Sequence, residues 1–453
     1  MGVSLAATRG AALSGPAERG WRSRVQDPVP WVVGLFLATF LLQRIATPGL
    51  PVPVTVPLAV VWLGAVLALG VVELSRTRLP VWLFAAGISG LMVVVQILVV
   101  VRPYISVNSW ALWLVTWLPL VVQLRRRDLD TYRRCVRALA RVGLGLAVLS
   151  LSFLGVQLAG FRYYDWLGTV VPPSLLVQDY VIAYPIVYGS PLYKSNGWIA
   201  LEPSFMSFFL GVTLICAFLA RVKVVHVLVI AAGLLSTVAG SGLALVLVFL
   251  LALGVRGQLA PLRRYLVPLA AVAALFGTTV FGGAILSRLT EVGTANSSTS
   301  LRSIQPYVQL WPSWVSDPAG IFVGHGPGSS AVAVINSGID GLLVPSLAKV
   351  LYDYGLLGGA ALVVLMVLTY LRAPSSAFAV SLAASMFVLQ AASQPLVICS
   401  ILLLALWSPP LAATALRRPL ENRLDRASRP SSTPGRRPLG TRARAGATAV
   451  GAR

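Results

Sequence analysis

The stretch VHVLVIAAGLLSTVAGSGLALVLVFLLALG, residues 225–254, decides how the chain is folded. It contains no Asp, Glu, Lys or Arg, and it is longer than the roughly 20 apolar residues that cross a bilayer. Ala239-Gly240-Ser241 forms a candidate turn near its middle, so it is either one long helix or two short helices. Both are helical, because lipid offers the backbone no hydrogen-bond partners.

Similar apolar runs occur along the whole chain. Apolar residues make up 57% and charged residues 11% of its 453 residues, where soluble domains have about 45–50% and about 25%. If residues 225–254 form two spans, the runs are Val29–Ala46, Val54–Glu73, Pro80–Val101, Ser109–Leu124, Ala138–Leu158, Phe205–Ala220, Val225–Val238, Gly242–Gly254, Tyr265–Leu286, Leu347–Leu371, Phe378–Ser393 and Leu396–Leu411. The sequence therefore predicts an all-α transmembrane bundle of about 12 spans.

The positions of the basic residues decide between one helix and two. With the N-terminus inside, the inner connections carry Arg76, Arg78, Arg125, Arg126, Arg127, Arg133, Arg134, Arg137, Arg221, Lys223, Arg256, Arg263, Arg264 and Arg372. The outer connections carry far fewer, as the positive-inside rule requires. One long helix would reverse every later loop and place the basic C-terminal tail outside. The charges therefore favour two short spans and both termini in the cytoplasm, in a protein of the cell membrane.

The same distribution defines the domains. We expect a basic cytoplasmic tail at residues 1–28, a membrane bundle at 29–412, and a disordered basic tail at 413–453 that lies against anionic membrane lipid. The net charge of +22 arises from these tails and the inner loops, which argues against a nucleic-acid partner. Three widely separated cysteines predict neither a disulfide nor a metal site.

Two outer connections, 159–204 and 287–346, are much longer than the others. Long loops are usually functional or disordered, and the first is too rich in aromatic residues for disorder. We expect it to fold over the mouth of the bundle and bind substrate. Its candidate binding residues are Arg162, Tyr163, Tyr164, Trp166, Lys194 and Trp198.

The candidate catalytic residues lie at the end of the first loop and along the second. Glu202 precedes Pro203 where the next helix begins, so it either caps that helix or acts as a base. Arg288 and Arg302 offer forked donors for phosphate or diphosphate, or they extend along the membrane interface. His325 is either a proton carrier or a solvated loop residue.

Two further features of the second half are distinctive. Gly326 and Gly328 follow His325 closely and permit close backbone approach, here to a substrate. Asp353 lies within a predicted span, where a carboxylate is functional by default. Lys349 lies four residues earlier, and an ion pair between the two is the structural alternative. Ser236, Gly240 and Ser241 resemble the small residues of close helix packing.

Taken in order, these motifs resemble the O-antigen ligase and O-antigen polymerase superfamily over roughly residues 202–359. The matching motifs are Glu202-Pro203-Ser204, the broken helix pair around Ser236–Gly242, Arg288, Ser300-Leu301-Arg302, Gly324-His325-Gly326-Pro327-Gly328, and Tyr352-Asp353-Tyr354-Gly355-Leu356-Leu357-Gly358. The resemblance implies a membrane glycosyltransferase, without metal or cofactor, that acts at the outer face on glycans linked to undecaprenyl diphosphate. It also implies that Arg288 and Arg302 hold the diphosphate leaving group.

One departure separates the two branches of this superfamily. The ligases carry a His-Asn pair where this chain reads Val344-Pro345-Ser346-Leu347. The missing histidine favours a polymerase that joins lipid-linked repeats into a surface polysaccharide, alongside a flippase and a chain-length regulator as possible partners. A ligase-type transferase is the alternative. A transporter of lipid-linked glycan is the alternative from a different class, but transport is typically accompanied by mid-membrane charges and repeated halves, which the sequence lacks.

Overall fold

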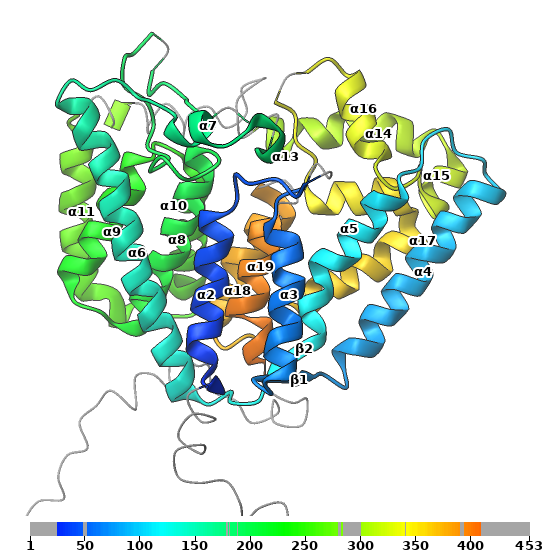
Figure 1. The fold of residues 1–453 in the computed structure, drawn as a ribbon, viewed down its shortest axis with the longest axis horizontal. Coiled ribbons are helices and arrows are strands. Elements are labelled where there is room, and N and C mark those ends of the chain that lie inside the picture. The colour runs from blue at the N-terminus through cyan, green and yellow to red at the C-terminus, as the bar shows by residue number, and fades with distance from the viewer. Residues whose placement is uncertain are drawn as a thin grey trace, which may run out of the picture.

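The computed structural model describes residues 25–48, 52–177, 180, 182–187, 189–279, 282–283, 300–339, 341–389 and 394–408. Within these residues the chain is almost entirely helical (Figure 1), so the all-α prediction is confirmed. Four helices are long and apolar enough to cross a bilayer: α4 (Arg78–Leu98), α6 (Leu129–Leu158), α8 (Pro203–Ala220) and α17 (Ser346–Leu368). The shorter apolar helices are α2 (Pro28–Leu41), α3 (Thr55–Ala68), α5 (Val107–Trp117), α9 (Val224–Ser236), α10 (Gly240–Val255), α11 (Arg263–Gly277), α18 (Ser376–Ala384) and α19 (Gln394–Leu403).

The two ends of the bundle differ in the loops they carry (Figure 1). We call one end the basic end, because the arginines of the predicted inner loops lie there. It holds the connection between α3 and α4 and the start of α6. We call the opposite end the loop end, because it holds the described parts of both long connections. Their helices are α7 (Trp166–Val170), α13 (Ser300–Ser303), α14 (Gln305–Val315), α15 (Pro318–Val323) and α16 (Ser329–Asn336).

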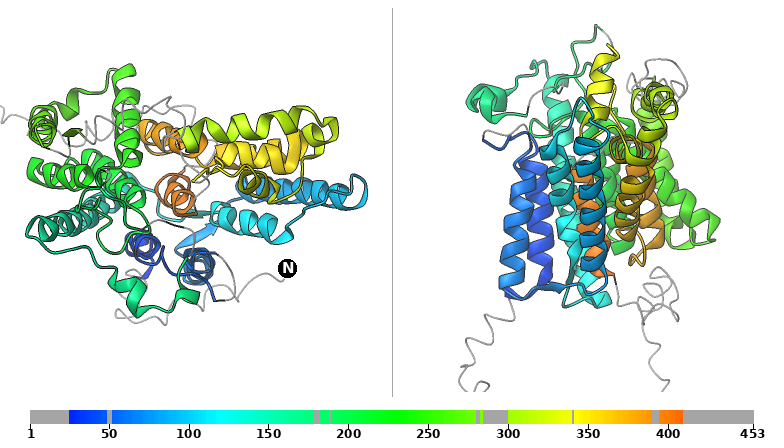
Figure 2. Two further views of the ribbon diagram at one scale, coloured as in Figure 1. Left: turned by 90° about the horizontal axis from the view of Figure 1, so that it is seen from above. Right: turned by 90° about the vertical axis from the view of Figure 1, so that its right-hand side faces the viewer.

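Residues 225–254 form two helices rather than one. α9 ends at Ser236 and α10 begins at Gly240, as the loop charges predicted. The predicted close packing also occurs, because a Cβ atom on Gly242 would lie 1.9 Å from the Ser207 backbone oxygen. α10 therefore lies directly against α8. The view along the bundle (Figure 2, left) shows α8 among α6, α9 and α10.

Two predicted spans are wrong at their ends. Residues 72 and 73, placed at the end of the second span, belong to β1 (Val72–Leu74). Residues 122–124, placed at the end of the fourth span, form β2 (Val122–Leu124). The two strands pair antiparallel with Glu73 opposite Gln123. A run of apolar, β-branched residues suits a short strand as well as a helix, and only the presence of a partner strand decides between them.

The described part of the second long connection is mostly helical. Short helices α13 to α16 replace the predicted loop and pack on one another and on α17. The first connection is irregular apart from α7 and a 3-10 turn at Pro173–Leu175. It is tied to the bundle by backbone hydrogen bonds, such as that from the Ala46 amide to the Leu175 carbonyl at 2.8 Å.

Candidate active site

Glu202 and Arg302 are 100 residues apart in sequence and form an ion pair at the loop end. The Nη2 atom of Arg302 lies 3.2 Å from Oε2 of Glu202. The Glu202 side chain is 8% exposed and that of Arg302 is 23% exposed, so a substrate can reach the arginine more easily than the carboxylate. The fold therefore joins two of the predicted catalytic residues.

The Glu202 carboxylate is held by the start of α8 and the first turn of α10. Glu202 stands at the N-cap position with extended backbone, but its side chain caps no helix amide. Its Oε2 atom instead accepts a hydrogen bond from the Ser204 hydroxyl at 2.9 Å. The Ser241 hydroxyl donates to the Ser204 carbonyl at 2.6 Å. The close packing of α8 and α10 thus positions the carboxylate, and the helix-capping alternative does not apply to its side chain.

The predicted partner arginine, Arg288, lies outside the described residues. Its role as a second diphosphate ligand remains a prediction. Arg302 is the predicted diphosphate ligand that the structure describes.

The candidate binding residues of the first connection fall into two sets. Tyr163 and Trp198 pack against Phe153 of α6, with ring centroids 5.5 Å and 5.0 Å apart. Lys194 is also buried, with its amine 5.8 Å from the centre of the Tyr184 ring. These three side chains hold the segment together. The exposed side chains, which are free to meet a ligand, are Arg162, Tyr164 and Trp166.

An ion pair that the sequence did not reveal fastens this connection to the segment that follows α2. Both terminal nitrogens of Arg44 donate to the Asp165 carboxylate, at 2.8 Å and 2.7 Å. Burial raises the pKa of Asp165, but the Arg44 guanidinium and the Gly168 and Leu167 amides together outweigh this effect, so the pKa lies below its usual value. The available signal was an arginine at the outer end of a span, where the positive-inside rule disfavours it.

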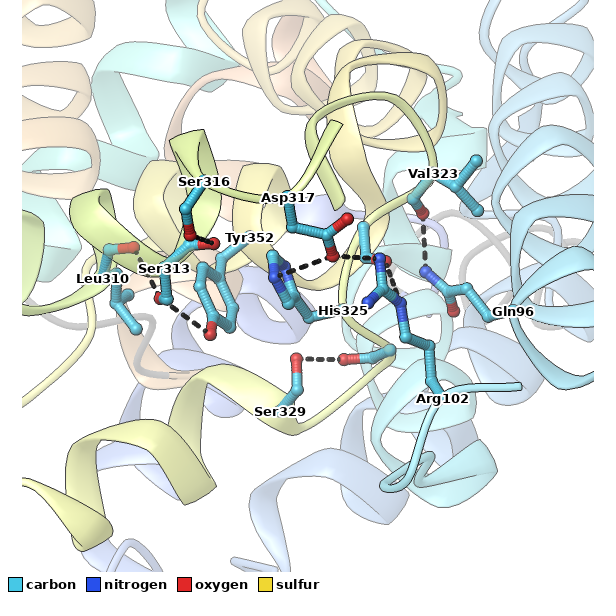
Figure 3. Close-up of polar contacts among 12 residues, drawn as sticks. Gln96, Arg102, Leu310, Ser313, Ser316, Asp317, Val323, His325, Ser329 and Tyr352 are labelled. Carbon is cyan, nitrogen blue, oxygen red and sulfur yellow. Dashed lines mark hydrogen bonds and ion pairs between the residues drawn. The ribbon is translucent and has the colours of Figure 1, made fainter. Parts of the chain in front are cut away.

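His325 belongs to a second cluster of charged side chains (Figure 3). Its ring is stacked on Tyr352, with centroids 4.3 Å apart. Its Nε2 atom lies 3.5 Å from Oδ2 of Asp317, and the same oxygen lies 2.6 Å from Nη2 of Arg102. Sequence reasoning did not connect Arg102 or Asp317 with His325. Their contact depends on how α15 packs beside the connection between α4 and α5.

The electrostatics of this cluster keep the imidazole neutral. Burial lowers the pKa of His325 most, Arg102 lowers it further, and Asp317 opposes them only in part. Nδ1 is buried and has no hydrogen-bond partner within the described residues.

The glycine loop around His325 packs against a break in α17. Gly355 has a φ of 65° inside that helix, and a Cβ atom on Gly324 would lie 2.6 Å from the Gly355 nitrogen. The His325 amide donates to the Tyr352 carbonyl at 2.9 Å and the Gly326 amide to the Asp353 carbonyl at 3.0 Å. The loop thus supplies the hydrogen bonds that the broken helix turn lacks.

Asp353 joins this loop to α17 through its buried carboxylate. It accepts from the Gly328 amide at 3.0 Å and from the Ser330 amide at 2.8 Å. The predicted ion pair with Lys349 is present at 2.7 Å. The Gly328 amide therefore donates its hydrogen bond within the chain. The contacts of Asp353 are those of a residue that holds the glycine loop on α17.

The two clusters occupy different parts of the loop end. Figure 1 shows α13, which carries Arg302, over the middle of the bundle, whereas α15, which precedes His325, lies at its far side. No ion pair or hydrogen bond between described residues joins Glu202 or Arg302 to His325. Within the described residues no group of three His, Cys, Asp or Glu side chains could hold a metal ion.

An all-α bundle with long apolar helices and an arginine–carboxylate pair at its loop end is the architecture of an integral membrane protein with a polar site at one surface. Residues 32–407 match the family model described as WcaD colanic acid polymerase, and the chain belongs to this family. This is a family of the O-antigen polymerase type, and the chain is a polymerase-like, glycosyltransferase-type membrane enzyme of polysaccharide synthesis. The match confirms the resemblance and extends it over nearly the whole bundle. No curated protein and no solved structure matches the chain.

Proposed function

We propose that this chain joins oligosaccharide repeats linked to undecaprenyl diphosphate into a surface polysaccharide at the outer face of the cytoplasmic membrane. The separation of the two ends supports this orientation. The arginines of the predicted inner loops gather at one end and both long connections at the other. Under the positive-inside rule the loop end is then external, with about 12 spans and both termini in the cytoplasm.

The proposed reaction transfers the growing chain from its carrier lipid to a new repeat. A hydroxyl oxygen of the acceptor sugar attacks the anomeric carbon of the donor. The bond from that carbon to the diphosphate oxygen breaks, and the diphosphate leaves with the electron pair. The hydroxyl proton passes to the Glu202 carboxylate. Negative charge grows on the diphosphate, and the Arg302 guanidinium stabilises it.

The observation that carries this proposal is the Glu202–Arg302 pair. It places a carboxylate that can accept a proton beside a guanidinium whose N–H groups can bind diphosphate oxygens. Transfer of a sugar from diphosphate requires both groups. Among the described residues only the Oε2 oxygen of Glu202 is engaged, by Arg302 and Ser204. The Oε1 oxygen is therefore the one we assign to the acceptor hydroxyl.

The remaining candidate residues have supporting roles in this proposal. Arg288 assists Arg302 at the diphosphate. The exposed rings of Tyr164 and Trp166 stack on sugar faces, as their 61% and 43% exposure permits. Tyr163 and Trp198 act by holding the loop.

His325 has no role in the transfer step of this proposal. We assign the proton transfer to Glu202 because no ion pair or hydrogen bond between described residues joins His325 to Glu202 or Arg302. We propose a polymerase rather than a ligase because the chain lacks the His-Asn pair that the ligases carry.

Replacement of Arg302 tests the proposal. Arg302→Ala should abolish chain extension in cells while the protein still inserts into the membrane. Arg76→Ala is the matched control, because it removes an exposed arginine at the basic end and should leave polymer length unchanged. Normal long-chain polymer from Arg302→Ala would refute the assignment.

The location of the accumulated intermediate separates an enzyme from a transporter. A polymerase variant should accumulate single lipid-linked repeats on the outer face, where an added glycosidase digests them in intact spheroplasts. Repeats that are protected until the cells are opened would indicate a flippase.

A further inference from the structure

Helix α14 (Gln305–Val315) has three distinct faces. It lies at the loop end with its axis across the direction of the bundle helices (Figure 1 and Figure 2, left). One face packs on the protein, and two faces with different chemistry are exposed. No residue of the helix is charged.

The first face belongs to the protein core. Pro306 and Leu310, four residues apart, are buried. Leu310 lies in a cluster with Ala348 and Tyr352 of α17, against which Tyr307 and Trp314 also pack. This face fixes the helix on α17 and hence fixes the direction of the other two.

The second face is apolar and exposed. Ile304, directly before α14, is 45% exposed, Val308 is 59%, Trp311 is 56% and Val315 is 44% exposed. These positions are separated by four, three and four residues, which places them on one side of a helix. Water would contact an apolar stripe here, which is unfavourable.

The third face is also exposed, but it is polar. Gln309 and Pro312 lie on it together with Ser313 and Ser316, all of them exposed. The Ser313 and Ser316 hydroxyls donate to backbone carbonyls of the helix, but a helix inside lipid would leave the exposed Gln309 amide without a water partner. A helix in water has no need of an apolar stripe beside them. The two exposed faces therefore indicate that one side of α14 meets lipid and the other meets water.

Exposed apolar side chains also occur on the two helices that lie next to α14 in the packing, α15 and then α4. α14 contacts α15, and α15 contacts α4. Phe322 of α15 is 55% exposed, and Leu98 and Val99 at the end of α4 are 72% and 74% exposed. α4 is one of the four helices that are long and apolar enough to cross a bilayer. A chain of contacting helices with exposed apolar side chains therefore connects α14 with α4.

We propose that α14 is an in-plane interfacial helix whose stripe of Ile304, Val308, Trp311 and Val315 is immersed in the acyl chains of the outer leaflet. Its polar face lies in water, as in other helices at a membrane surface. Arg302 lies two residues before Ile304, so the helix holds the guanidinium at headgroup depth. A diphosphate on a membrane-anchored carrier lies at that depth. This last consequence rests on the proposed function, whereas the position of α14 does not.

Site-directed spin labelling tests the position of α14. Single cysteines are introduced as Val308→Cys and Trp311→Cys on the apolar face, and as Gln309→Cys and Ser316→Cys on the polar face. The three natural cysteines are buried, so the unmodified full chain provides the labelling blank. Nitroxide-labelled protein is placed in nanodiscs of phosphatidylethanolamine and phosphatidylglycerol. Collision rates are then measured with oxygen, which concentrates in lipid, and with a water-soluble nickel chelate.

The expected result is a ratio of oxygen to nickel collisions several-fold higher at 308 and 311 than at 309 and 316. Equal ratios at all four positions would overturn the proposal. Labels at 308 and 311 that neither reagent reaches would also overturn it, because a second copy or another protein would then cover the stripe. Val308→Cys is nearly isosteric and keeps the test valid if Trp311→Cys fails to fold. The measurement uses no substrate, so its outcome is independent of polymerase activity.

Discussion

Replacing Asp353 with asparagine should destabilise the protein far more than removing any single donor to it. The carboxylate is completely buried. Its Oδ1 atom accepts from the Ser329 hydroxyl at 3.1 Å and the Ser330 amide at 2.8 Å, and its Oδ2 atom from the Gly328 amide at 3.0 Å and the Lys349 amine at 2.7 Å. Four donors therefore converge on one group.

The size of the effect follows from these contacts. Asparagine keeps one acceptor oxygen and turns an NH₂ group toward two of the donors. At least one buried backbone amide then loses its partner, at about 1–3 kcal/mol, and the charge-assisted bonds are weakened by about 1.5–3 kcal/mol. Lys349 is 19% exposed and can turn to water, so its loss adds little. We expect Asp353→Asn to cost about 3–5 kcal/mol.

Ser329→Ala is the matched control, because it removes one neutral donor and should cost about 1 kcal/mol. Unfolding can be followed with a thiol-reactive fluorophore, since Cys135, Cys216 and Cys399 are buried and react only when the bundle opens. At about 1–2 °C for each kcal/mol in a chain of this size, Asp353→Asn should lower the transition by about 4–8 °C at a fixed scan rate.

An unfolding temperature for Asp353→Asn no lower than that of Ser329→Ala would refute this reasoning. If that variant were also stable but inactive, Asp353 would have a catalytic role, as a carboxylate within a membrane span suggests by default.

Two further predictions concern the His325 cluster and the packing of α8 on α10. Arg102 lowers the pKa of His325 and Asp317 raises it, so Arg102→Gln should raise that pKa and Asp317→Asn should lower it further. Histidine NMR can resolve this because the chain has two histidines, and shifts in the same direction would contradict the geometry. A folded-state pKa below the unfolded value means that the neutral imidazole contributes stability above about pH 6.5, which is lost as the pH falls through the folded-state pKa. Gly242→Ala would place a Cβ atom 1.9 Å from the α8 backbone and should cost about 3 kcal/mol or more in the thiol assay. Gly240→Ala meets nothing within 4 Å and should unfold at the wild-type temperature, so equal losses in the two glycine variants would exclude close packing as the cause.

Patterns that are local along the chain could be predicted from the sequence. Hydropathy located the apolar segments, and the loop charges divided residues 225–254 into α9 and α10. The Lys349–Asp353 pair was predictable because i,i+4 neighbours on a helix meet whatever surrounds them. The three further hydrogen-bond donors to Asp353 could not be predicted from the sequence, because the glycine loop that supplies them reaches α17 only through tertiary packing.

Contacts between distant segments could not be predicted from the sequence, which indicated at most the single residues that take part in them. β1 and β2 form because residues 72–74 and 122–124 meet at the basic end, and nothing in either segment alone distinguishes a strand from the end of a helix. Arg102 and Asp317 were not linked to His325, since the three come from two connections that are more than 200 residues apart.

Glu202 and Arg302 show where sequence and structure each contribute. The sequence by itself determined that the chain is a membrane bundle, because transfer of apolar segments out of water is nearly additive along the chain. It also identified each of the two residues as a candidate. Only the tertiary structure decided that they form a pair, and that α14 beyond Arg302 has separate core, apolar and polar faces. Contacts between residues 100 positions apart depend on how helices pack in three dimensions, and a one-dimensional pattern of hydropathy and charge does not contain that information.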